Sequence, residues 1–176
     1  MTFVLGNRSL QTLTGVHPDL VRVVKRAIEL TPVDFTVLEG VRRLVRQKHL
    51  VAIGASITLD SRHLTGHAVD LGAWVDGGVE WSWPLYFKIA EAMRDGADEL
   101  DIPLTWGGCW QMINGVDDLY AAQTATLNAR KPKAGNPSWT VRTFTCHAHI
   151  SLSLRRQHEY LEFPHGSCQP CYRIGG

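Results

Sequence analysis

One stretch of ten residues, from Ser61 to Asp70, constrains this chain more than any other. It reads Ser-Arg-His-Leu-Thr-Gly-His-Ala-Val-Asp, so it carries two histidines, a carboxylate, a hydroxyl and a guanidinium. It runs into an apolar alternation at Val69, Leu71 and Ala73, which predicts a half-buried strand. Imidazole nitrogen and carboxylate oxygen are ligands of catalytic zinc sites that keep one position open for water. The alternative is that these histidines are surface or hydrogen-bonded structural residues.

Composition narrows the class of protein. The chain has 176 residues, of which 44% are hydrophobic and 20% charged, as expected for one ordinary globular domain. A net charge of +1 gives no electrostatic case for nucleic acid or for anionic membranes. The sequence shows neither a secretory signal pattern nor a stretch of membrane-spanning length. We therefore expect a cytoplasmic monomer with no nucleic-acid or membrane partner.

Hydrophobic periodicity predicts the elements around this stretch. Helices are expected at about 18–30, 41–52, 83–100 and 116–127, and His17 is expected to cap the first of them. Strands are expected near 34–38, 68–74, 102–107 and 145–153. The Asp-Gly-Gly sequence at 76–78 is typical of a hairpin turn between 74 and 81.

The pattern Ser-x-His-x-x-Gly-x-Ala-x-Asp runs from Ser61 to Asp70 with no position missing. It resembles the signature of zinc peptidases that cut peptidoglycan stem peptides: the D-Ala-D-Ala dipeptidases and carboxypeptidases, and the phage L-alanyl-D-glutamate endopeptidases. The resemblance implies that His63 and Asp70 bind one zinc ion. A physical argument agrees, because Gly66 lets the chain turn back so that both side chains converge, and the small Ala68 keeps the strand near its neighbours.

Two shorter patterns are similar to the same family. A Glu-Gly-x-Arg step ends at Arg42, and the resemblance implies that this arginine holds the substrate carbonyl or the developing oxyanion; alternatively it is a solvated charge. A Trp-Gly-Gly-x-Trp segment begins at Trp106, which is expected to line the substrate groove or to belong to the core. Ser61 and Arg62 are candidates for holding the substrate carboxylate or backbone.

Near the carboxyl end of the chain the sequence departs from the family pattern. There the family has a carboxylate, two further residues and a histidine, which implies that His149 is the third zinc ligand. The general-base carboxylate is then replaced by Cys146, a thiol with a higher ordinary pKa and a tendency to bind zinc. The substitution silences or impairs the enzyme, or zinc alone supports slow hydrolysis. In another register His147, which shares a strand face with His149, serves as ligand or proton carrier.

These observations predict an α+β fold similar to the Hedgehog and D-Ala-D-Ala peptidase fold. Helices pack on one face of a small, mainly antiparallel sheet and a zinc groove lies on the other. We expect one catalytic-type domain over 1–176, with a family-like core at about 10–152, a tail at 153–176 and no separate wall-binding domain. The predicted function is that of an endolysin, a zinc peptidase that leaves the host cytoplasm to cut the L-alanyl-D-glutamate bond of the stem peptide. The alternatives are a non-catalytic peptidoglycan-binding or zinc-stabilised module and a D,D-carboxypeptidase.

Overall fold

A computed structural model describes residues 2–129 and 149–152 of the chain. Its helices are α1 (Asn7–Thr12), α2 (Pro18–Leu30), α3 (Leu44–Ala52), the short 3-10 helix η1 (Arg62–Thr65), α4 (Trp83–Glu99) and α5 (Leu119–Ala129). Its strands are β1 (Phe35–Glu39), β2 (Ala68–Val75), β3 (Gly78–Glu80), β4 (Leu104–Trp106), β5 (Gln111–Met112) and β6 (His149–Leu152). None of the helices in these ranges is long and apolar enough to cross a membrane.

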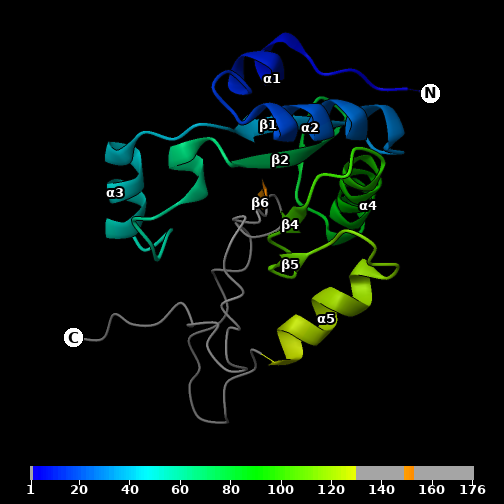
Figure 1. The fold of residues 1–176 in the computed structure, drawn as a ribbon. Coiled ribbons are helices and arrows are strands. Elements are labelled where there is room, and N and C mark those ends of the chain that lie inside the picture. The colour runs from blue at the N-terminus through cyan, green and yellow to red at the C-terminus, as the bar shows by residue number, and fades with distance from the viewer. Residues whose placement is uncertain (1, 130–148, 153–176) are drawn as a thin grey trace.

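The strands form one sheet in the order β1-β2-β6-β4-β5, and β3 pairs with β2 as a hairpin. Each of these pairings is antiparallel, which confirms the predicted kind of sheet. Strand β6 comes from near the carboxyl end of the chain but lies between β2 and β4 (Figure 1). This insertion brings the predicted third ligand segment beside the strand that carries Asp70.

The core lies on one face of the sheet. Val69, Leu71 and Ala73 of β2 are buried there, with the apolar sides of α2 and α4. Side chains alternate between the faces of a strand, so Asp70 belongs to the opposite face. Figure 1 shows α2 running over β2 with α4 at one end, while α3 stands at the other end. Helices on one face and candidate ligands on the other match the predicted α+β arrangement.

The helix boundaries follow local chemistry. Helix α2 begins at Pro18, and the His17 side chain caps it by accepting a hydrogen bond from the Asp19 backbone nitrogen at 3.3 Å, as expected. Helix α3 begins at Leu44, three residues later than predicted, because the chain before it is held against η1. There the Arg42 backbone nitrogen donates to the His63 carbonyl oxygen at 3.0 Å.

The predicted hairpin is confirmed. Val75 pairs with Gly78, which leaves a two-residue turn of Asp76 and Gly77. Their φ angles are 49° and 83°, and a type I′ turn needs positive φ at both positions.

Gly66 ends η1 with a φ of 73°, and a Cβ at this position would lie 2.6 Å from the Gly15 carbonyl oxygen. We expect Gly66→Ala to lower the free energy of unfolding by more than the roughly 1–2 kcal/mol that a left-handed backbone alone costs. Gly77→Ala is the matched control, since Gly77 has a φ of 83° and nothing within 4 Å of an added Cβ. Urea unfolding of both variants measures the difference, and equal losses would show that the contact with Gly15 is unimportant.

Candidate metal centre

Two of the predicted ligands lie together. His63 comes from η1 and is only 2% exposed, and Asp70 comes from β2 with its side chain 21% exposed. The distance between His63 Nε2 and Asp70 Oδ2 is 3.5 Å. The left-handed turn at Gly66 reverses the chain between them and so makes the approach possible.

The tautomer of His63 follows from its other ring nitrogen. Nδ1 lies 2.8 Å from the Gly40 carbonyl oxygen, and because a carbonyl only accepts hydrogen bonds, Nδ1 carries the proton. In the neutral ring Nε2 is therefore an acceptor, and it faces a carboxylate oxygen that is also an acceptor. Two facing acceptors need a proton or a cation between them. A backbone carbonyl bound to the far nitrogen is also the usual support of a metal-binding histidine.

The separation of these two atoms suits zinc. Atoms that each bind one tetrahedral zinc ion at about 2.0–2.1 Å lie about 3.3–3.4 Å from one another. The observed 3.5 Å between His63 Nε2 and Asp70 Oδ2 is close to this value. The donor pair therefore fits a zinc ion without a large movement of either side chain.

The strand register gives the place of the predicted third ligand. Asp70 on β2 is the direct partner of His149 on β6, and directly paired residues lie on the same face of an antiparallel sheet. The side chain of His149 is not among those that the structure describes, and Cys146 and His147 lie outside the described residues. Among the described side chains no group of three His, Cys, Asp or Glu could hold a metal, so the described part of the site supplies two donors.

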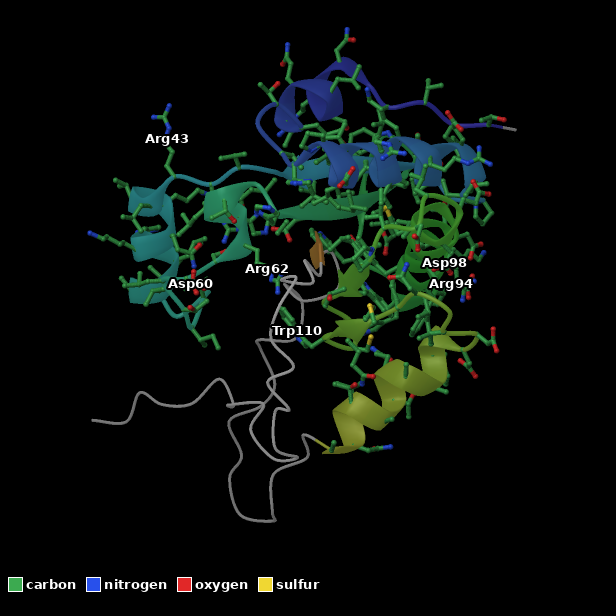
Figure 2. The ribbon with its side chains drawn as sticks, in the orientation of Figure 1. Arg43, Asp60, Arg62, Arg94, Asp98 and Trp110 are labelled. Atoms are coloured by element: carbon green, nitrogen blue, oxygen red, sulfur yellow. The ribbon has the colours of Figure 1, made fainter. Side chains whose placement is uncertain are left out.

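A buried arginine borders this pair. The side chain of Arg42 is 9% exposed, and its Nη2 lies 2.5 Å from Glu39 Oε2 and 3.4 Å from Asp70 Oδ2. Its Nη1 donates to Gln47 Oε1 at 2.8 Å. Gln47 is fully buried and donates through Nε2 to the Thr58 carbonyl oxygen at 2.6 Å. The solvated alternative for Arg42 is thus wrong; in Figure 2 it is the neighbouring Arg43 that projects away from the body of the molecule.

Glu39 reaches this network through an irregularity in β1. Val37 pairs with Leu71 but Glu39 pairs with Asp70, so a β-bulge at Leu38 shifts the register and places Glu39 opposite Asp70. Burial alone would raise the pKa of Glu39, but hydrogen bonds from Arg42 and Arg46 and their positive charges outweigh it. The pKa of Glu39 therefore lies below its ordinary value and the side chain stays ionised. The sequence patterns assigned Glu39 no role, although a charged residue at the end of an apolar strand was a signal for one.

Ser61 and Arg62, which were predicted to bind the substrate, lie in different environments. The Ser61 hydroxyl caps η1 by accepting from the His63 backbone nitrogen at 3.4 Å. Arg62 is exposed, and Figure 2 labels it near the centre of the view, below the sheet.

The Trp-Gly-Gly-x-Trp segment places its two rings in different environments. Trp106 is 1% exposed and packs edge-on against Phe87 and Trp83, with ring centroids 5.6 and 6.4 Å away, so the structure favours its core alternative. The exposed ring of this segment is that of Trp110, which is 42% exposed and has a φ of 54°. Positive φ is uncommon for a bulky residue and marks a locally strained turn. The sequence pattern did not separate the two rings.

His67 gives the site a pH-dependent neighbour. Burial, the ring of His17 with its centroid 4.9 Å away, and the charge of Arg62 lower the pKa of His67, although a bond with Thr65 opposes them. The unfolded chain then binds a proton at a higher pH than the folded one, so stability is lost as the pH falls from about 6.5 toward the lower folded-state pKa. We expect urea midpoints measured from pH 7.5 to 5.5 to fall more for the unaltered protein than for His67→Gln. Parallel curves would contradict this assignment.

Comparison with known proteins agrees with the fold. The family of phage L-alanyl-D-glutamate peptidases matches residues 1–129. The L-alanyl-D-glutamate peptidase of Escherichia phage T5 is 33% identical over 122 residues, which are 67% of this chain and 89% of that protein. The crystal structure of the Serratia marcescens L-Ala D-Glu endopeptidase ChiX matches with a TM-score of 0.62 and 37% identity, covering 85% of this chain and 90% of that one. The chain belongs to the phage L-alanyl-D-glutamate peptidase family.

Proposed function

We propose that this protein is a zinc-dependent peptidase that cuts the L-alanyl-D-glutamate bond of peptidoglycan stem peptides. One observation carries the proposal: the acceptor atoms of His63 and Asp70 face each other at 3.5 Å, with Asp70 paired to His149 on the next strand. In a chain of this family, such a pair indicates His63, Asp70 and His149 as the residues that hold one zinc ion. When bound, zinc polarises the scissile carbonyl and lowers the pKa of water.

Arg42 supplies positive charge beside this centre. Its Nη2 lies 3.4 Å from Asp70 Oδ2, and its guanidinium is fixed by Glu39 and Gln47. A fixed cation near the scissile carbonyl stabilises the negative charge that its oxygen gains during attack. Arg62 is exposed on η1, and we assign it to a carboxylate of the stem peptide, since guanidinium groups bind carboxylates with two parallel hydrogen bonds.

Hydrolysis also needs a carrier of protons. Water adds to the alanyl carbonyl carbon, the bond to the D-glutamate nitrogen breaks, and that nitrogen must gain a proton. Glu39 is unsuited to this task because both of its carboxylate oxygens bind arginines and its pKa lies below the ordinary value. The family resemblance assigns this task to the segment that holds Cys146 and His147, and we expect slow turnover because a thiol stands where the resemblance implies a carboxylate.

The cysteine favours a second candidate function. A protein with the family groove and Cys146 at the base position can bind peptidoglycan and zinc without turning over. Both candidate functions predict affinity for the cell wall. They differ because only the peptidase releases products.

Incubation of the unaltered protein with purified peptidoglycan separates these functions. The peptidase releases fragments with new amino groups on D-glutamate, and Asp70→Asn abolishes the release. Binding to the peptidoglycan without any released amino group would favour the non-catalytic module. Free D-alanine as the product would indicate a D,D-carboxypeptidase and contradict the proposed bond.

A further inference from the structure

Arg42 has two carboxylates within reach and divides its contacts unequally between them. Its Nη2 is 2.5 Å from Glu39 Oε2 but 3.4 Å from Asp70 Oδ2. The side chain of Arg42 is 9% exposed, so its charge is largely withdrawn from water and needs a counter-charge within the protein. Both carboxylates attract the guanidinium. A close pair with one of them leaves the other more available to a metal ion.

The β-bulge at Leu38 is what brings Glu39 into this competition, since Glu39 and not Leu38 stands opposite Asp70. Glu39 is itself anchored, because its other oxygen accepts from Arg46 Nε at 2.7 Å. On the far side, Gln47 holds Arg42 Nη1 at 2.8 Å. The guanidinium is thus held closely by Glu39 and Gln47, and its hydrogen bond and ion pair with Asp70 are longer, at 3.4 Å.

We propose that Glu39 is a positioning residue for the metal centre: it diverts Arg42 from Asp70 and so keeps the Asp70 carboxylate available to zinc. This inference rests on the proposed zinc site and adds a residue that the sequence patterns gave no role. Without the Glu39 carboxylate, Arg42 closes the 3.4 Å gap to Asp70 and competes with the cation for the same oxygen. Positioning groups beyond the ligands typically change metal affinity by about 10–100-fold.

The variant Glu39→Asp tests the diversion because it keeps the charge but withdraws the carboxylate by about one bond, ~1.5 Å. Zinc affinity of the full chain is measured by competition with a chromogenic chelator, and the thermal midpoint without zinc checks folding. We expect Glu39→Asp and Glu39→Gln to weaken zinc binding by about 10–100-fold. Glu99→Asp is the matched control, since Glu99 pairs with Arg26 Nε at 2.5 Å on the surface between α2 and α4.

A second variant separates diversion from other causes. In Glu39→Asp/Arg42→Met the competing cation is absent, so zinc affinity returns toward that of the unaltered protein. Affinity that stays low in the double variant would overturn the inference, as would a Glu39→Asp variant that binds zinc as tightly as the unaltered protein. An unaltered protein that binds no zinc would overturn the metal site itself and this inference with it.

Discussion

Cys146→Asp is expected to raise the rate of stem-peptide hydrolysis by about 10²–10⁴-fold, which is the usual contribution of a positioned acid–base group. The resemblance to the family implies a carboxylate at this position, three residues before the proposed ligand His149. A carboxylate is ionised at neutral pH and accepts a proton from the attacking water, whereas most of a cysteine with ordinary pKa is protonated. Initial rates of amino-group release from purified peptidoglycan measure the effect at equal protein concentration.

Cys168→Asp, the same change in the tail of the chain, is the control and should leave the rate unchanged. Zinc content should be about one ion per chain in the unaltered protein and in both variants. An unchanged rate for Cys146→Asp would mean that Cys146 does not occupy the base position. The proton carrier would then be sought at His147, the alternative that the sequence pattern left open.

Asp70→Asn is expected to remove both zinc binding and hydrolysis. Loss of a residue that only hydrogen-bonds to a metal ligand lowers metal affinity by roughly 10–100-fold. Asp70→Asn should lower zinc affinity by more than this, because the variant loses a charged ligand. The neutral amide also removes the negative charge that faces His63 Nε2 at 3.5 Å and Arg42 Nη2 at 3.4 Å. Metal analysis after exhaustive dialysis and the peptidoglycan assay give the two readouts.

His67→Gln is the matched control for Asp70→Asn because His67 belongs to the same ten-residue stretch. Its Nδ1 lies 2.9 Å from the Thr65 hydroxyl. The control should keep its zinc and its rate at neutral pH. Loss of zinc from His67→Gln together with retention in Asp70→Asn would reassign the centre to the other histidine of the stretch.

The features that the sequence could predict are those that depend on short spacing. His63 and Asp70 are seven residues apart with a glycine between them, so local turn chemistry suffices to bring them together. The alternation of Val69, Leu71 and Ala73 marks the core face of β2 and thereby assigns Asp70 to the other face. The Asp76–Gly77 turn and the cap at His17 are likewise local.

The features that could not be predicted depend on which strands pair. Glu39 meets Asp70 only because β1 contains a bulge, and nothing in the local alternation of residues 35–39 indicates that irregularity. Trp106 and Trp110 both flank a pair of glycines, and only the packing of β4 against α4 decides that Trp106 is the buried ring. The delayed start of α3 depends on another contact between distant residues, since the Arg42 backbone nitrogen donates to the His63 carbonyl oxygen in η1.

The most direct test of the central claim is the identity of the bond that Cys146→Asp cuts. Purified peptidoglycan is digested with this variant, and mass spectrometry with end-group labelling identifies the new terminal residues. The account predicts a new amino terminus on D-glutamate and a new carboxyl terminus on L-alanine, with neither produced by Cys146→Asp/Asp70→Asn. Release of free D-alanine, or cleavage that persists without Asp70, would contradict it.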